Sequence, residues 1–386
     1  MSDTKPLVTV IMQNYNTPQD ILDTAIYSVL NQSFNSFAFI FIDDWSTDYD
    51  TSSFFPAIKA RWEELRPDMP LHLVVKPQSG PLDERDHNHG HSFCRNWGLD
   101  LVKTAKISDY VFFMDSDDEL IPNALEILWK KIENDSDIDI SIGNFTRNDV
   151  YWCQCKDKYY SISNEGGTYT PGLHDDKIYT SLEALNVLCD PYMIPGHRPT
   201  MPSVAFCATW NKIFKVSLFD NVRFPDYRTK DDNFTAHRLL WNAKKIGFTF
   251  EITYFYRPGG KLADANLYKT MDIVDAHRDR VEFFEKIFED WICAGKMIRE
   301  DNLEDYTRIC DILRNEHMLY LFTLMAVYKN FKNHHDESTT CYEEFVYSLN
   351  VWKKEFVYGE QKFLEACVKW MEKTHMDRIS EVPVEG

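Results

Sequence analysis

The stretch "YVFFMDSDDEL" (Tyr110–Leu120) passes from a run of mostly apolar residues directly into a cluster of acidic ones. Such an apolar run is typical of a strand that is covered on both faces. Asp115, Asp117 and Asp118 would then follow the end of that strand. Carboxylates in this position could bind a divalent cation that bridges phosphate oxygens. They could also form a solvated turn and an acidic start to the next helix.

Three similar apolar runs precede this one, and segments with helical spacing lie between them. The runs are "LVTVIM" (Leu7–Met12), "FAFIFID" (Phe37–Asp43) and "LHLVV" (Leu71–Val75). Repeated strand–helix–strand units predict an α/β fold, with a mostly parallel sheet flanked by helices. A later segment, "DIDISI" (Asp137–Ile142), alternates strictly between polar and apolar residues. This alternation predicts a strand with one face in water.

Local signals in two helical segments predict how these helices begin and pack. Thr17 precedes Pro18 and is expected to cap the first helix. Ser92 is expected to cap a later helix that carries Trp97. Gly98 in that helix is expected to let it pack closely against the sheet.

The length of 386 residues predicts either one large domain with an appended part or two domains. We place the boundary near residue 260, where the periodicity becomes helical almost throughout. Residues 1–260 would form the α/β domain, with a ligand-binding part (1–145) and a second part (146–260). Residues 261–386 would form a helical C-terminal region that could form an oligomer interface or touch a membrane surface.

Composition and charge exclude several classes of protein. The chain is 44% hydrophobic and 27% charged, which argues against a mostly disordered protein. A formal net charge of −19 argues against a nucleic-acid partner. The longest apolar run, "MLYLFTLMAVY" (Met318–Tyr328), is shorter than the roughly 20 residues of a membrane-spanning helix. Nine cysteines without a CxxC pair, and no export signal, predict reduced thiols and a cytoplasmic location, which could be peripheral to a membrane.

The first glycine of the chain is Gly80. A dinucleotide-binding G-x-G-x-x-G or a P-loop would need glycines just after the first strand, so that backbone amides can reach phosphate. Both kinds of site are therefore excluded. A diphosphate bound at the sheet edge would need cations, and Asp115 and Asp117 fit that need.

Five ordered motifs resemble those of family 2 glycosyltransferases with the GT-A fold, and a sixth segment is similar. The resemblance covers about the first 257 residues. It is carried by the following segments: "VTVIMQNYN", "AIYSVLNQSF", "FIFIDDWSTD", "GHSFCRNWGLDL", "YVFFMDSDDEL" and "TWNKIFKVSLFDNVRFPDYRTKDDNF". It implies an inverting, metal-dependent transfer of a sugar from a nucleotide-diphosphate sugar, most often a UDP-sugar, to a hydroxyl of a glycan or glycoconjugate.

The resemblance also implies which residues bind the donor. Tyr15 would stack near the base, and Asp44 would accept a hydrogen bond from the imino N–H of uracil. Asp43 could support the turn, and Arg95 would face the nucleotide. Ser116 lies within the D-S-D-D donor motif.

The same resemblance implies a cofactor, Mn²⁺ or Mg²⁺. Asp117 would bind the metal. Asp115 would lie on the side of the donor that carries the ribose and the metal. The metal would neutralise the charge that develops on the departing nucleoside diphosphate. The role of Asp118 stays open.

Inverting transfer needs a base that removes the proton of the acceptor hydroxyl. The motif match makes Asp232 the base and Asp231 its neighbour, with the alternative that both only open a helix. Trp210, Asn211 and Lys212 would lie near the acceptor, although Trp210 could be a core residue. Arg257 and Lys261 could close over the diphosphate.

Other interpretations remain at this point. A sugar-nucleotide nucleotidyltransferase could share the sheet, but "QNYNTPQD" lacks its Gly-rich basic loop. A non-catalytic module that binds nucleotide sugars could share the scaffold. The histidines of "HNHGH" (His87, His89 and His91) are more often solvent-facing than metal-binding.

Overall fold

In a computed structural model of the protein, the structure describes residues 5–77, 88–146, 150–153, 158–161, 176–190, 201–226, 228–257, 267–293, 303–330, 340–341 and 343–348. Two residues singled out in the sequence, Lys261 and His87, lie outside these ranges.

Strands and helices alternate through the first 146 residues, as expected. They are β1 (Val8–Asn14), α1 (Gln19–Leu30), β2 (Phe37–Asp43), η1 (Thr51–Phe54), α2 (Phe55–Leu65), β3 (Leu71–Val75), α3 (His91–Ala105), β4 (Tyr110–Asp115), β5 (Glu119–Leu120), α4 (Ala124–Asn134) and β6 (Ile138–Thr146).

The elements that follow are more irregular in order. They are β7 (Val150–Cys153), β8 (Lys158–Ser161), β9 (Lys177–Tyr179), α5 (Ser181–Leu188), α6 (Met201–Cys207), β10 (Lys212–Lys215), η2 (Val216–Phe219), α7 (Asp231–Asn242), β11 (Lys245–Phe255), α8 (Leu267–Cys293) and α9 (Leu303–Asn330).

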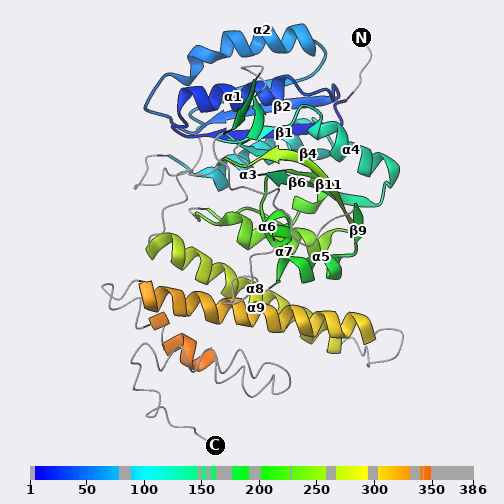
Figure 1. Cartoon of the computed structure of the whole chain (residues 1–386), viewed down its shortest axis with the longest axis vertical. Helices are drawn as coiled ribbons and strands as arrows, with labels where there is room; N and C mark the ends of the chain where they lie inside the picture. The colour runs from blue at the N-terminus through cyan, green and yellow to red at the C-terminus, as the bar shows by residue number, and fades with distance from the viewer. Residues whose placement is uncertain are drawn as a thin grey trace, which may run out of the picture. The chain divides into compact units, whose positions relative to one another are not determined.

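A nine-stranded sheet organises the fold, in the order β3-β2-β1-β4-β10-β6-β11-β5, with β9 also paired to β11. Strands β1, β2, β3, β4, β6 and β11 run in one direction, whereas β5, β9 and β10 run in the other. The predicted α/β fold with a mostly parallel sheet is therefore confirmed. Figure 1 shows β1, β2 and β4 side by side, and α5, α6 and α7, which pack against one another, grouped near β9.

Strands β1 and β2 are buried along their whole length, which explains their continuous apolar runs. The expectation for "DIDISI" was wrong, because β6 is also buried throughout rather than wet on one face. Its polar side chains are satisfied by protein groups: Asp139 accepts from Lys215 Nζ at 3.0 Å and from the Lys244 amide at 2.8 Å. The Ser141 hydroxyl donates to the Leu128 carbonyl at 2.8 Å.

The two predicted helix caps were wrong, because both hydroxyls make tertiary contacts. The N-cap of α1 is Pro18, and the Thr17 and Ser116 hydroxyls lie 2.7 Å apart. The N-cap of α3 is Gly90. The prediction for Gly98 was right, since a Cβ at this position would lie 2.7 Å from Ile11 Cγ2 on β1.

The helices α8 and α9 agree with the expected helical periodicity beyond residue 260. The chain divides into two compact units, Met1–Tyr320 and Leu321–Gly386. The domain boundary near residue 260 stays a prediction. Within the described ranges, none of the helices combines the length and apolarity that a membrane crossing requires.

Candidate functional site

The acidic loop after β4 gathers three carboxylates. Single oxygen atoms of Asp115, Asp117 and Asp118 all lie within 4.8 Å of one another. Asp115 and Asp117 are half-buried, and Asp118 is buried. Closely spaced carboxylate oxygens are the ligands that Mg²⁺ and Mn²⁺ prefer, so this donor set fits the expected metal.

Asp118 makes its own set of contacts with the end of β11. One of its oxygens accepts from the Tyr254 hydroxyl at 2.8 Å, and the other accepts from the Arg257 amide at 2.8 Å. Burial raises the pKa of Asp118 well above its ordinary value, and the charges of Asp117 and Asp115 raise it further. Both oxygens of Asp118 therefore accept hydrogen bonds from the end of β11, which fixes this carboxylate within the loop.

Arg257 also contacts the acidic loop with its side chain. Its Nε donates to the Asp117 carbonyl at 2.8 Å. The arginine therefore adds positive charge at the loop where the sequence predicts a diphosphate.

The turn after β2 is built on Asp43. Its carboxylate accepts from Asn14 Nδ2 at 2.7 Å, from the Ser46 hydroxyl at 2.6 Å and from the Thr51 hydroxyl at 2.9 Å. Tyr15, which follows β1, is half-buried. The contacts of Asp43 are those of a residue that supports the turn, as the sequence predicts.

Asp44 binds the segment that leads into α3. Its two oxygens accept from the Gly90 amide at 2.7 Å and from the His89 amide at 2.9 and 3.1 Å, and the His89 ring Nδ1 lies 3.0 Å away. Burial raises the pKa of Asp44 more than these hydrogen bonds lower it. The contact with uracil stays a prediction. The expectation that His89 faces solvent was wrong, because the residue is buried against Asp44.

Arg95 joins the acidic loop to the second acidic pair. Its Nη2 donates to Asp115 Oδ1 at 2.8 Å, and its Nη1 donates to both oxygens of Asp231, at 2.8 and 2.7 Å. Ser92 donates to Asp231 Oδ2 at 3.1 Å instead of capping α3. Burial lowers the pKa of Arg95, but Asp231 and Asp115 outweigh it and raise the pKa above its ordinary value.

Asp231 and Asp232 begin α7, and their environments shift their pKa values in opposite directions. Burial raises the pKa of Asp231, but the charges of Arg95 and His91 hold it below its ordinary range. Burial and the charge of Asp231 raise the pKa of Asp232. Asp232 is half-buried and accepts from Asn233, through its amide at 2.9 Å and its side chain at 3.0 Å. Opposed pKa shifts in an acidic pair are typical of groups with different chemical roles.

Trp210 and Asn211 are buried in the sheet domain. Trp210 stacks on Tyr254, with ring centroids 4.9 Å apart and ring planes 9° apart. Asn211 donates to the Gly143 carbonyl at 2.9 Å and to the Asn144 carbonyl at 3.0 Å. These contacts give both residues a role in packing, and the expected contact with the acceptor stays a prediction.

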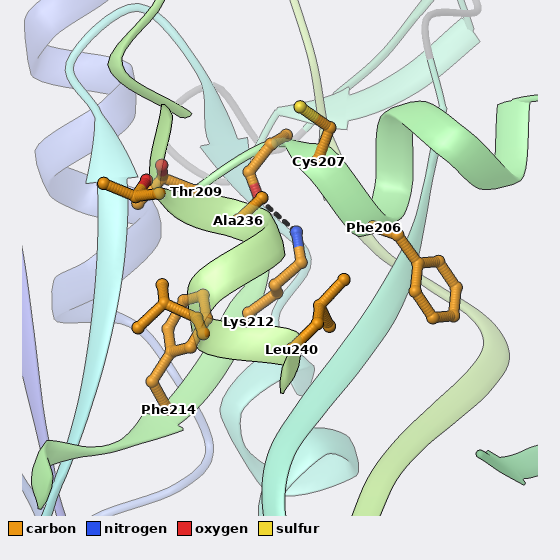
Figure 2. Close-up of a pocket in the computed structure, with 10 residues that line it drawn as sticks. Phe206, Cys207, Thr209, Lys212, Phe214, Ala236 and Leu240 are labelled. Atoms are coloured by element: carbon orange, nitrogen blue, oxygen red, sulfur yellow. Dashed lines mark hydrogen bonds between the residues drawn. The ribbon is translucent and has the colours of Figure 1, made fainter. Parts of the chain in front are cut away.

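Lys212 is almost fully buried, with 2% of its surface exposed. Its ammonium donates to the Ala208 carbonyl and lies 3.4 Å from the Trp210 carbonyl. Figure 2 shows the Lys212 side chain among the residues that line a cavity of about 10 Å³. Burial lowers the pKa of Lys212 to about 7.

The sequence did not point to two of the residues that organise the site. Tyr254 lies in "EITYFYRP", where its role as a partner of Asp118 depends on a strand pairing that local sequence does not reveal. Gln13 lies within the "VTVIMQNYN" motif and donates to Asp115 Oδ1 at 2.6 Å, a contact that depends on the pairing of β1 with β4.

Comparisons with known proteins indicate the family of the chain. Residues 82–222 match the model of a family described as "Glycosyl transferase family 2". GlyG of Streptococcus pneumoniae, named as a glycosyltransferase, is 25% identical over 292 residues, which cover 75% of this chain and 82% of GlyG. TuaG of Bacillus subtilis is 33% identical over 264 residues, which cover 65% of this chain and 89% of TuaG. It is named "Putative teichuronic acid biosynthesis glycosyltransferase TuaG".

A solved structure with a similar fold is that of S. aureus TarS 1-349 in complex with UDP-GlcNAc. The alignment covers 89% of this chain and 81% of that chain, with a TM-score of 0.55 and 15% sequence identity. At this identity the likeness concerns the fold, and it agrees with the expected GT-A-like architecture.

Proposed function

The chain belongs to glycosyltransferase family 2, and we propose that it moves a sugar, with inversion, from a UDP-sugar to a hydroxyl of a glycan or glycoconjugate in a reaction that uses Mn²⁺ or Mg²⁺. The observation that carries this proposal is the position of Arg95, which contacts both the acidic loop and the acidic pair. It brings together Asp115, a donor-side carboxylate, and Asp231, the neighbour of the candidate base Asp232.

The choice of donor rests on two lines of support. TarS, whose fold is similar, was solved with UDP-GlcNAc, and the chain places Tyr15, Asp43 and Asp44 at the ends of β1 and β2. Ligands of open α/β sheets bind at this edge. A glycan acceptor is supported by the name of TuaG, which refers to the synthesis of a polysaccharide.

Asp115 and Asp117 would hold the metal, with Ser116 between them in the donor motif. When bound, the metal supplies Lewis-acid stabilisation of the negative charge on the leaving nucleoside diphosphate. Arg257, held at the carbonyl of Asp117, adds a second positive charge on that side.

Asp232 would remove the proton from the acceptor hydroxyl while its oxygen attacks the anomeric carbon from the face opposite the leaving group. Asp231 is less suited to this step, because Arg95 and Ser92 already donate to its oxygens. A raised pKa suits Asp232 to proton transfer, since a base is most effective when its pKa approaches the working pH.

The test is a panel of UDP-, GDP- and TDP-sugars with Mn²⁺, scored by release of nucleoside diphosphate and by melting shift. We expect release with a UDP-sugar and a higher melting temperature in its presence. A protein that responds to none of these donors would contradict the proposal. Pyrophosphate release from a nucleoside triphosphate would favour a nucleotidyltransferase instead. Cytoplasmic location, and contact of the C-terminal helices with a membrane or a second copy, stay predictions.

A further inference from the structure

The tripeptide His89-Gly90-His91 connects two carboxylates that lie far apart in the sequence. On one side of Gly90, the His89 amide and ring contact Asp44 at the end of β2. On the other side, His91 Nε2 lies 3.2 Å from Asp231 Oδ1, at the start of α7. Because Gly90 has a φ of 87°, a backbone conformation that favours glycine, the two histidines can turn toward different partners.

Three residues from the first turns of α3 converge on Asp231. His91 and Arg95 approach Oδ1, while Ser92 and Arg95 donate to Oδ2. His91 and Arg95 are four residues apart, so they share one face of the helix. Asp231 is 2% exposed, and both its oxygens have partners from α3. The start of α7, and with it Asp232, is therefore fixed by contacts with α3.

We propose that His91 is a positioning residue for proton transfer: together with Arg95 it holds Asp231 in place, and so sets the position and the electrostatic environment of the adjacent base Asp232. This inference rests on the proposed function. It assigns a role to a residue to which the resemblance assigns none.

The charges that face His91 favour a cationic ring. Burial lowers the pKa of His91, but Asp231 outweighs it and raises the pKa above its ordinary value, with Arg95 opposing and Asp115 assisting. The imidazole side chain is 27% exposed, so it lies at the border of the site rather than in the core. A cation at this point stabilises the ionised acidic pair.

The experiment compares the wild type with His91→Gln and His91→Ala, and uses His72→Gln as the matched control. His72 lies on β3, an edge strand of the sheet. Glutamine can still donate to Asp231 but carries no charge, whereas alanine removes both properties. The measurements are the donor-induced melting shift, kcat and KM for transfer, and the pH profile of kcat/KM.

If His91 positions the base, His91→Ala keeps the donor-induced melting shift but lowers kcat by about 10-fold to 100-fold, because small misplacements of a catalytic group are costly. His91→Gln recovers part of the loss. In both variants the acidic limb of the pH profile moves to higher pH, because the acidic pair has lost a neighbouring cation. His72→Gln behaves like the wild type.

Wild-type kcat and an unshifted acidic limb in His91→Gln would overturn the inference while leaving the proposed function intact. If the wild type itself transferred no sugar from any donor, the proposed function would be wrong, and this inference with it. If His91→Ala failed to fold, the role of His91 would be decided by comparing His91→Gln with His72→Gln. The two quantities compared are kcat and the position of the acidic limb of the pH profile.

Discussion

Lys212→Met is predicted to remove a pH-dependent cost of folding. Lys212 is buried, and its ammonium has the carbonyls of Ala208 and Trp210 as hydrogen-bond acceptors. Burial lowers its pKa from 10.5 to about 7. Methionine has a similar length and no ionisable group. It therefore fills the same space beside the cavity shown in Figure 2 and does not titrate.

The sign and the size of the effect follow from proton linkage. Between pH 7 and pH 10.5 the unfolded chain keeps the Lys212 proton and the folded chain does not. Folding stability therefore rises with pH across this window, and the cost is greatest at pH values below it. One pKa unit corresponds to about 1.4 kcal/mol, so the wild type should gain about 2 kcal/mol of stability, relative to Lys212→Met, between about pH 7.5 and about pH 9.

Urea denaturation of both proteins at these two pH values measures the difference directly. The matched control is Lys215→Met, because Lys215 lies on the same strand, is half-buried and pairs with Asp139 at 3.0 Å. The control should keep the wild-type pH dependence in this range. A stability difference between the wild type and Lys212→Met that does not change with pH would refute the reasoning.

Three further predictions concern the site and its support. Asp117→Ala should abolish the metal-dependent release of nucleoside diphosphate. The control Asp109→Ala should keep this activity, because Asp109 lies at the opposite end of β4 and its side chain is 77% exposed. Equal activity of the two variants would contradict the metal role of Asp117. Asp231→Asn should lower the free energy of unfolding by about 1.5 to 3 kcal/mol in chemical denaturation, because it removes one of the two carboxylates that pair with Arg95, and an unchanged stability would count against that ion pair. Gly143→Ala should lower the melting temperature, because its Cβ would lie 1.8 Å from Thr253 Oγ1, and a wild-type melting temperature would show that this contact is misplaced.

Much of the fold could be predicted from the sequence, because the strands that form the donor side are continuous apolar runs. Their carboxyl ends place Asp43 and Asp115 on one edge, and the pairing of β1 with β2 and β4 follows from the alternation of strands and helices. Gly98 was also predictable, since a glycine in a helix that covers a sheet often permits close packing.

The errors came from polar residues whose partners are distant in sequence. Asp139 appeared to face water, but Lys215 and Lys244 satisfy it inside the fold. Ser92 appeared to be a helix cap, but it donates to Asp231 across 139 positions of the chain. Local patterns identify a polar side chain and not its tertiary partner, so these errors could not be avoided without the strand order.

The short antiparallel strand β10 is a second element that the local sequence does not predict. It inserts between β4 and β6, although its sequence, "KIFK", begins with a lysine that is buried. Lysine side chains are rarely fully buried, so a lysine at that position argues against a buried strand. The carbonyl of Ala208, four residues earlier, provides the partner that makes the burial tolerable.

The most direct test of the central claim is the rate of sugar transfer by Asp232→Asn, measured with Mn²⁺ and the donor that the wild type uses. The geometry predicts that the variant keeps its donor-induced melting shift, because Asp115 and Asp117 are intact. It also predicts that transfer falls by at least about 100-fold, because the acceptor hydroxyl loses its base. Transfer at the wild-type rate would contradict the assignment of Asp232 and the mechanism built on it.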